Sequence, residues 1–340
     1  MKRLICAALC LAVLTGCAIN PSAEKKQYTA TFLTLFDTVT TIVGKAESED
    51  AFRVEAQIIH DELLVYHQLF DIYNEYDGIN NLKTVNDSAG IEPVVVDRKI
   101  IDLLLDCRSF YEATGGKVNI AMGGVLKLWH DARSDSIDDP LNAYLPDASA
   151  LREAAGHVSF DAVVIDEASS TVYLSDPALR LDVGAVAKGW SAEQVARNAH
   201  EGLLISVGGN VLATGAKDEK GTPWVVGIQS PDDAQRYLNT IYVSDGCVVT
   251  SGDYQRTYTV DGKAYHHIID PDTLYPSAYW RSVTVVCADS GAADALSTAL
   301  FLLPHAEGQA LLKRYDAKAM WVGVDGEIVY SPGFEELIRT

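Results

Sequence analysis

The segment from Ser282 to Leu303, SVTVVCADSGAADALSTALFLL, joins a predicted strand to a predicted helix. Ser282–Val286 is rich in Thr and Val, residue types that favour extended backbone. Asp289 is a favourable helix N-cap, and the small and apolar residues after it continue as a helix to Leu303. A strand therefore leads directly into a helix at this point. The order of helices and strands in the rest of the chain then decides the fold class.

Two polar residues of this helix, Asp294 and Thr298, are candidates for a metal site. They are four residues apart, so they lie on one face of the helix. A carboxylate and a hydroxyl on one face offer two oxygen ligands to a hard cation such as Mg²⁺. The alternative is that both are ordinary polar residues of a half-exposed helix, and the rest of the chain has to decide between the two.

Helices and strands are mixed along the chain without a regular β–α–β alternation. This pattern predicts an α+β fold with mixed or largely antiparallel sheets. The turn Val260-Asp261-Gly262-Lys263 between two strand-like runs is a strong hairpin signal. No later segment resembles a linker, so residues 28–340 are expected to form one domain with two lobes. Helices are predicted at 47–70, 97–113, 148–155, 191–200, 289–303 and 306–315, and strands at 28–44 (one strand or a hairpin), twice within 158–175, and at 203–207, 224–228, 240–243, 248–250, 257–260, 282–286, 319–322 and 328–330.

The first residues of the chain, MKRLICAALCLAVLTGC, resemble the signal of a bacterial lipoprotein. Two basic residues precede an apolar stretch, 4–14, that is too short for a stable membrane span. Leu14-Thr15-Gly16-Cys17 resembles a lipobox, which predicts a signal peptide at 1–16, a lipid on Cys17 and a polar tether to residue 27. The expected location is therefore the extracytoplasmic face of a bacterial membrane, held by the lipid. The alternative is an ordinary secretory signal with a chance cysteine.

Charge and cysteine content narrow the classes of function. The chain has 47 acidic and 27 basic residues, and loss of the two basic residues of the signal would change the formal charge from −20 to −22. No basic stripe is present, so nucleic acid is not expected as a partner, and an anionic ligand would need a metal or a local cation. Cys107, Cys247 and Cys287 are widely spaced, which predicts buried free thiols and supports neither a disulfide framework nor a zinc site.

The segment Leu181–Trp190, LDVGAVAKGW, is a glycine-rich turn that follows a predicted strand and opens a helix. Such a turn can bind phosphate through backbone N–H groups and the helix dipole, and Lys188 would add a cation beside Asp182. The ending of a Walker loop is missing. A purely structural turn is the alternative, as it is for the Gly-Gly turn of ISVGGN at 205–210.

Two adjacent histidines, His266 and His267, lie on a predicted strand before the turn Asp270-Pro271. Neighbouring residues of a strand face opposite sides, so only one histidine is expected to face a given pocket, which argues against a paired metal site. Histidine is suited to general base catalysis near neutral pH. A structural role is the alternative.

Taken in order, the motifs LDVGAVAKGW, SVGGN, PWVVGIQSP, TSGDYQRTYTVDGKAYHHIIDPDTLYP and ADALSTALFLL resemble those of the ApbE family of flavin transferases, which are often lipoproteins. The resemblance runs from about Phe36 to Tyr330. Its early part is looser: FDT at 36–38 stands where the family has MGT, and YNEYDGINNL at 73–82 where it has a tyrosine and an acidic, serine-rich turn. GKVNIAMG at 116–123 stands where it has a FDITVG run, with Asn119 in place of the usual acid.

The resemblance implies an α+β fold related to the T-fold, with FAD held between two lobes. It implies an Mg²⁺ site made by the side chains of Asp294 and Thr298 and the main-chain carbonyl of Ala185, with Asp294 essential for catalysis. It makes His267 the candidate base that activates the acceptor hydroxyl. The residues implied to contact FAD are Phe36, Tyr73, Lys117, Val118, Asn119, Asp182, Lys188 and Ile269.

The implied reaction is the transfer of FMN from FAD to a threonine or serine hydroxyl of an exported flavoprotein, with release of AMP. Asp182 and Asp294 near one diphosphate make electrostatic sense only with a cation between them. Two other functions remain open: hydrolysis of FAD to FMN and AMP, and non-enzymatic storage of FAD.

Overall fold

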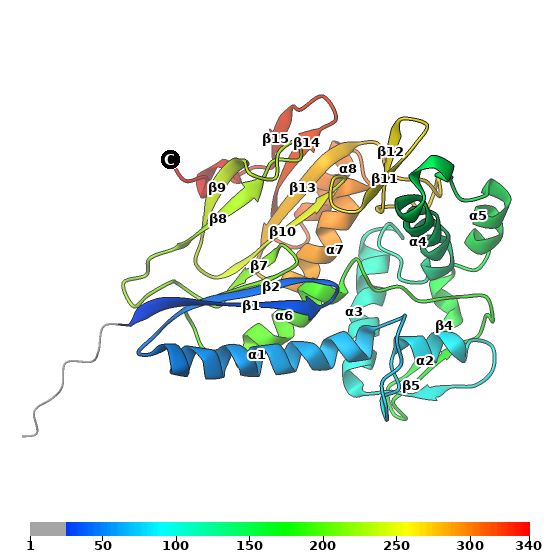
Figure 1. Cartoon of the computed structure of the whole chain (residues 1–340), viewed down its shortest axis with the longest axis horizontal. Helices are drawn as coiled ribbons and strands as arrows, with labels where there is room; N and C mark the ends of the chain where they lie inside the picture. Colours follow the sequence, from blue (N-terminus) through cyan, green and yellow to red (C-terminus); the bar gives the residue numbers. More distant parts are fainter. Residues whose placement is uncertain (1–24) are drawn as a thin grey trace, which may run out of the picture.

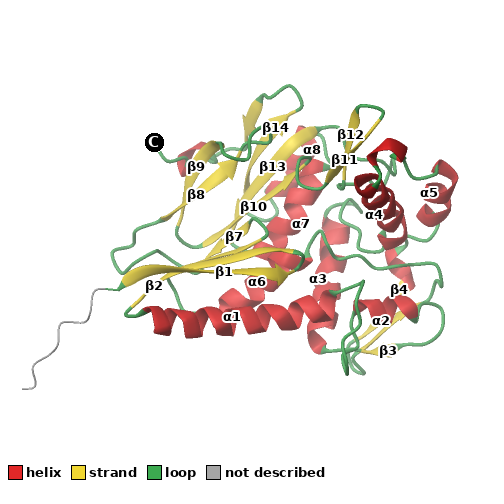
Figure 2. Cartoon of the chain, in the orientation of Figure 1, coloured by secondary structure: helices red, strands yellow, loops and turns green. Residues whose placement is uncertain are grey.

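A large antiparallel sheet with helices on one face forms the centre of the molecule (Figures 1 and 2). The computed structural model describes residues 25–340. The sheet has eight strands, and each pair of neighbouring strands is antiparallel. From one edge of the sheet to the other, the strands are β1 (Lys26–Leu35), β2 (Thr38–Ala46), β6 (Leu203–Val207), β7 (Asn210–Ala213), β10 (Gly246–Gly252), β13 (Trp280–Cys287), β14 (Lys318–Gly323) and β15 (Ile328–Tyr330).

Three small sheets accompany the large one, and their strand pairs are antiparallel too. The predicted hairpin at Val260–Lys263 is confirmed, because it joins two of these strands. The small sheets are β3 (Val94–Val95), β5 (Thr171–Leu174) and β4 (Val163–Asp166); β8 (Trp224–Gln229) and β9 (Tyr237–Val243); and β11 (Thr257–Val260) and β12 (Lys263–His266). The predicted α+β class with largely antiparallel sheets is confirmed.

The helices are α1 (Glu49–Phe70), α2 (Leu82–Asp87), α3 (Arg98–Ala113), α4 (Gly123–Asp138), α5 (Ala148–Ala155), α6 (Ala187–Asn198), α7 (Ser290–Phe301) and α8 (His305–Leu312), with short 3₁₀ turns at Pro140–Asn142, Phe160–Ala162 and Glu335–Leu337. None of the helices in residues 25–340 is long and apolar enough to cross a membrane.

Both faces of the large sheet are covered. Helices α1, α6 and α7 pack on one face and form the main core with it (Figure 1). The hairpin β8–β9 covers part of the other face, where Trp224, Ile228 and Ile241 pack against Met320 of β14. The α4–α5 pair packs against β11 in a smaller third cluster. Apolar burial of this kind is the main stabilising contribution to such a fold.

Some local predictions were wrong. The helix α4 and the short helix α2 were not predicted, and neither was strand β7. Helix α6 begins at Ala187, four residues before the predicted start at Ser191, so Lys188 lies in its first turn. The turn that opens α6 does not follow a strand directly, because β5 ends at Leu174 and only a single bridge, between Met122 and Arg180, precedes it.

At the N-terminus, β1 begins at Lys26, two residues before the predicted start of the domain. The predicted signal peptide, the lipidated Cys17 and most of the tether lie outside the described residues.

Candidate active site

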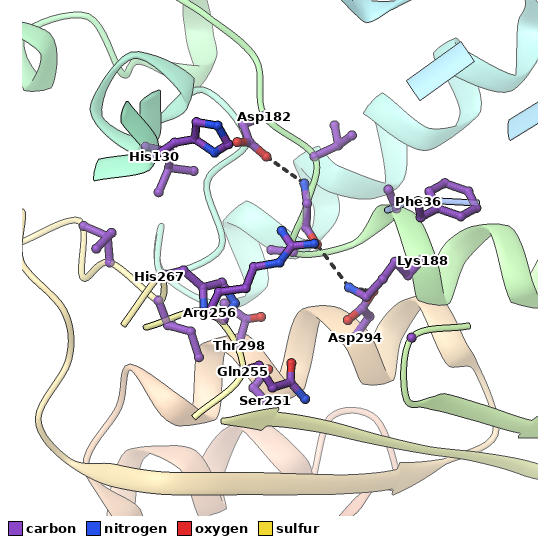
Figure 3. A pocket seen from close by; sticks show the side chains of 18 of the residues that line it. Phe36, His130, Asp182, Lys188, Ser251, Gln255, Arg256, His267, Asp294 and Thr298 are labelled. Carbon is purple, nitrogen blue, oxygen red and sulfur yellow. Dashed lines mark hydrogen bonds and ion pairs between the residues drawn. The ribbon is translucent and has the colours of Figure 1, made fainter. Parts of the chain in front are cut away.

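A cavity of about 570 Å³ lies among the β1–β2 turn, the end of α1, helices α4, α6 and α7, and the segment that leads into and out of the β11–β12 hairpin. Figure 3 shows side chains from these segments around it. The structure brings every residue that the sequence placed in the site to the wall of this one cavity. They are Phe36, Tyr73, Lys117, Val118, Asn119, Asp182, Ala185, Lys188, His267, Ile269, Asp294 and Thr298.

Helix α7, which carries Asp294 and Thr298, is buried on nearly all sides. Thr298 is the one residue of this helix that is not buried, and Asp294 is only 4% exposed. The helix is therefore not half-exposed, as the alternative supposed. A carboxylate this deep needs a partner, because an unpaired buried charge is costly.

The partner of Asp294 comes from the neighbouring helix. The backbone N–H of Gly189 in α6 donates a hydrogen bond of 2.8 Å to Asp294 Oδ2. A Cβ atom at position 189 would lie 2.2 Å from the Ser290 carbonyl oxygen and 2.6 Å from Asp294 Cβ, so only glycine allows the two helices to approach this closely. Lys188 Nζ lies 3.7 Å from the same carboxylate oxygen. The packing of α6 on α7 thus fixes one oxygen of Asp294.

The glycine-rich turn before α6 places a second carboxylate in the cavity. Asp182 Oδ1 accepts a hydrogen bond of 2.8 Å from the N–H of Gly184. Removal of its carboxyl from water raises the pKa of Asp182, although that hydrogen bond and the charges of Arg256, His130 and Lys188 oppose the shift. A cation bound in the cavity would favour the ionised form of this carboxyl.

The oxygen donors in the cavity fit a Mg²⁺ ion that is also bound by a ligand. Asp294 provides one carboxylate, Thr298 one hydroxyl and Ala185 one main-chain carbonyl, and all three residues line the cavity. The described residues contain no group of three or more His, Cys, Asp or Glu side chains that could hold a metal by themselves. Mg²⁺ is typically bound by one or two carboxylates together with substrate phosphates and water, so this set suits Mg²⁺ in the presence of a diphosphate.

The two histidines both line the cavity, which contradicts the prediction that only one would. The alternation rule does not apply, because β12 ends at His266. His266 is held by the main chain: its Nε2 lies 2.8 Å from the Ser277 carbonyl oxygen, and its Nδ1 accepts from the N–H of Ile268 at 3.2 Å. By contrast, Nδ1 of His267 is buried without a hydrogen-bond partner in the described structure. Of the two, His267 is therefore the one whose ring is not held by hydrogen bonds to the main chain.

Burial also sets the charge of His267. It lowers the pKa of this side chain to about 3, and Arg256 and His266 act in the same direction. His267 is thus neutral near pH 7, the state that can accept a proton.

Two of the predicted FAD-contacting residues have their polar groups engaged elsewhere. Lys117 Nζ lies 2.9 Å from Asp270 Oδ1 and 2.8 Å from Asp272 Oδ2. The Asn119 side chain donates to the Val158 carbonyl at 2.9 Å and accepts from the N–H of Ala121 at 2.9 Å. Both residues shape the wall of the cavity, and neither offers a free polar group to it.

Residues of the opposite wall were not singled out from the sequence. His130 and Arg133 come from α4 and Arg256 from the segment before β11, and Figure 3 labels His130 and Arg256. Arg133 Nη2 lies 3.2 Å from His130 Nδ1. The buried residues Val125, Trp129 and Ala132 have helical spacing, which was the signal that could have identified α4.

Neither Arg133 nor Arg256 forms an ion pair with an acid in the part of the chain that the structure describes. Burial, followed by the charge of Arg256, lowers the pKa of Arg133. Two guanidinium groups that line one cavity without an ion-pair partner among the described residues favour an anionic ligand there.

The antiparallel sheet and the cavity, which combines oxygen donors of α6–α7 with positively charged side chains, define an α+β protein with one polar site. The chain belongs to the ApbE family, which matches residues 36–321. The crystal structure of the ApbE protein of Thermotoga maritima superposes with a TM-score of 0.80 at 28% identity, covering 93% of this chain and 100% of that one. A flavinyl transferase ApbE of Pseudomonas stutzeri shares the fold, with a TM-score of 0.75 at 22% identity over 92% of this chain and 97% of that one. The predicted ApbE-like fold is thereby confirmed.

Curated relatives give the same family. A protein of Treponema pallidum named FAD:protein FMN transferase is 35% identical over 277 residues, which are 76% of this chain and 75% of that protein. A Klebsiella pneumoniae protein of the same name is 32% identical over 287 residues, 80% of this chain and 86% of that protein.

Proposed function

We propose that this protein is a flavin transferase that moves FMN from FAD to a threonine or serine hydroxyl of a partner protein and releases AMP. The names of its relatives support the reaction class. The observation that carries the proposal in this chain is the buried Asp294, whose carboxylate is fixed by the Gly189 N–H beside Lys188 and one helical turn from Thr298. This arrangement combines a divalent-cation site with a local positive charge, as a diphosphate substrate requires.

The α6–α7 wall would hold Mg²⁺ through Asp294, Thr298 and the carbonyl of Ala185. Bound Mg²⁺ supplies charge neutralisation at phosphoryl oxygens during displacement. Lys188 places a second positive charge beside the same carboxylate and can contact the diphosphate. On the opposite wall, Arg256 and Arg133 can donate hydrogen bonds to the phosphate oxygens that the metal and Lys188 do not contact.

His267 is the proposed general base. A threonine hydroxyl is a weak nucleophile at neutral pH, and a positioned base that accepts its proton contributes typically about 10²–10⁴-fold. His267 is neutral, lines the cavity and has no hydrogen bond that holds its Nδ1. The proton would pass from the hydroxyl to the imidazole of His267 as the oxygen bonds to phosphorus and AMP departs.

One incubation tests the proposed reaction against its alternatives. The protein is mixed with FAD, Mg²⁺ and an acceptor protein that contains an accessible threonine. Covalent flavin fluorescence on the acceptor with an equal amount of AMP supports the transferase. AMP and FMN without labelled acceptor indicate a hydrolase, and unchanged FAD indicates a carrier; either result would overturn the proposal.

We also propose that Cys17 carries a lipid that anchors the protein at the extracytoplasmic face of a bacterial membrane, where exported flavoproteins would be its acceptors. The lipobox-like LTGC sequence supports this location. A Cys17→Ser variant should leave the membrane fraction for the soluble fraction, because an acyl chain contributes about 0.8 kcal/mol per buried methylene. Unchanged membrane attachment of this variant would contradict the anchor.

A further inference from the structure

Cys247 and Cys287 lie directly opposite each other in the large sheet. They are paired residues in the antiparallel register of β10 and β13, although they are 40 positions apart in the chain. Cys247 is fully buried and Cys287 is partly exposed. The sequence predicted three separate buried thiols, and the fold instead brings two of them together at one end of a strand pair.

The two thiols share one corner of the structure. The Cys247 thiol donates a hydrogen bond of 3.1 Å to the carbonyl of Cys287, and the Cys287 thiol donates one of 3.2 Å to the carbonyl of Asp289. The neighbouring Cys287 side chain and burial both raise the pKa of Cys247. Cys107 lies on a different element, the buried face of α3, and serves as an internal comparison.

The register allows a bond between these sulfurs with a small adjustment of the strands. Opposite residues of an antiparallel pair have Cβ atoms about 4.5–5.5 Å apart. A disulfide requires a Cβ–Cβ separation of about 3.5–4.5 Å. Bond formation therefore needs the two Cβ atoms to approach by up to about 2 Å, and the resulting strain makes the bond easy to reduce.

We propose that Cys247 and Cys287 are a redox modification site that forms a reversible disulfide across β10 and β13. The oxidant is a low-molecular-weight disulfide. The more accessible Cys287 thiolate attacks it and releases one thiol, and the Cys247 thiolate then attacks the Cys287 sulfur and releases the second. Two protein thiols are oxidised to one disulfide, the reagent is reduced to two thiols, and the protons of the protein thiols pass to the released thiols.

The position of the pair connects it to the framework of the active site. Cys287 comes two residues before Asp289, the N-cap of α7, whose Oδ1 accepts from the N–H of Ala292 at 2.8 Å. Cys247 is the second residue of the strand whose other end, at Thr250 and Ser251, lines the cavity. The bond would thus tie β10 to the start of the helix that carries Asp294.

A peptide map of the full chain tests the bond. The protein is incubated with oxidised glutathione at about pH 8.5, near the ordinary pKa of a thiol. It is then denatured in N-ethylmaleimide and digested with trypsin without reduction. Tryptic peptides 237–256 and 282–313 hold Cys247 and Cys287, and 100–108 holds Cys107. We expect 237–256 and 282–313 to appear as one linked species that dithiothreitol separates, while 100–108 stays alkylated and unlinked. Full alkylation of both peptides, or links to other cysteines instead, would overturn the proposal.

A melting experiment gives a second readout. A bond that closes a loop of this length restricts the unfolded chain, so the oxidised wild-type protein should melt about 5 °C above the reduced protein. The Cys287→Ser variant should show no difference between oxidised and reduced samples, and Cys107→Ser should behave like wild type. A difference that persists in Cys287→Ser would overturn the assignment to this pair.

Discussion

The two walls of the cavity are built in different ways. On the α6–α7 wall, a glycine brings two helices together and a backbone N–H fixes the carboxylate of Asp294, which is only 4% exposed. On the opposite wall, formed by α4 and the segment before β11, Arg256 is exposed and Arg133 is half-buried, and neither has an acidic ion-pair partner among residues 25–340.

This difference separates two tasks. A small ion needs ligands at fixed distances, and ligands held by close-packed helices provide them. A large anionic substrate needs open surface and unpaired positive charge, which the second wall provides. Substitutions in the first wall should therefore change turnover, and substitutions in the second should change substrate binding.

The largest effect is expected for Asp294→Asn. The variant keeps a side-chain acceptor for the Gly189 N–H but loses the charged metal ligand, so flavin transfer should fall by about 10³-fold or more. Transfer rates at saturating FAD, together with circular dichroism to confirm folding, measure this. Asp289→Asn is the matched control on the same helix, and should retain turnover because Asp289 is an N-cap outside the cavity. Mg²⁺-dependent turnover that survives in Asp294→Asn would contradict the metal site.

The next effect concerns the histidine pair. His267→Gln should lower turnover by about 10²-fold while FAD still binds, because a base is lost. His266→Gln should keep turnover within a few-fold and lower the melting temperature, because His266 is bonded to the main chain at Ser277 and Ile268. Rate measurements at saturating FAD and acceptor separate the two. Equal losses of turnover would contradict the base role.

The opposite wall is tested by Arg256→Ala. Loss of a charge-assisted hydrogen bond to a phosphate should weaken FAD binding by about 30-fold and change turnover at saturation much less. Titration of FAD into the protein, followed by flavin fluorescence, measures the affinity. Lys127→Ala is the control, because Lys127 pairs with Asp131 on α4 and does not line the cavity. A fall in turnover without a change in affinity would break the distinction between the two walls.

A smaller effect is expected in the dependence of stability on pH. The pKa of His267 is about 3 in the folded protein and near 6.5 in the unfolded chain, so between these values the unfolded chain binds more protons. Stability should therefore fall as the pH drops from 6.5 toward 3. After a discount for partial exposure, burial of His267 should lower the free energy of unfolding at pH 5 by on the order of 1 kcal/mol, relative to pH 7.

Urea unfolding of wild type and His267→Gln between pH 4 and pH 7 measures this contribution. The variant should lose less stability on acidification, and parallel curves would contradict the low pKa. The same low pKa means that His267, the proposed general base, is neutral throughout pH 5–8. In that range the titration of His267 should therefore not change kcat/KM with pH, whereas an unperturbed histidine would titrate there.

Local sequence patterns were sufficient for most of the fold. Val- and Thr-rich runs identified strands such as β13, and the Asp289 cap identified α7. Helix α4 was missed because two glycines begin it and charged residues follow, so its apolar spacing was not recognised. Its place in the fold depends on packing with α5 and β11, which the local sequence does not encode.

In the site, too, the local sequence predicted some properties and long-range packing determined the others. The motifs identified residues that do line one cavity, but not their physical state. Whether Asp294 was buried or half-exposed depended on packing around all of α7. The orientation of His267 depended on where β12 ends, and the meeting of Cys247 with Cys287 on strand register. These properties arise from contacts between distant segments.

The central claim is that α6 and α7 hold the metal for flavin transfer. It is tested most directly by a Mg²⁺ titration of flavin transfer by wild type and Thr298→Val after treatment with a chelator. Thr298→Val removes one neutral ligand from the only position of α7 that is not buried. We predict no transfer before Mg²⁺ is restored, and a Mg²⁺ requirement about tenfold higher in the variant, for a loss of roughly 1.4 kcal/mol of binding. Transfer that proceeds fully in chelator, or identical titration curves for the two proteins, would contradict the claim.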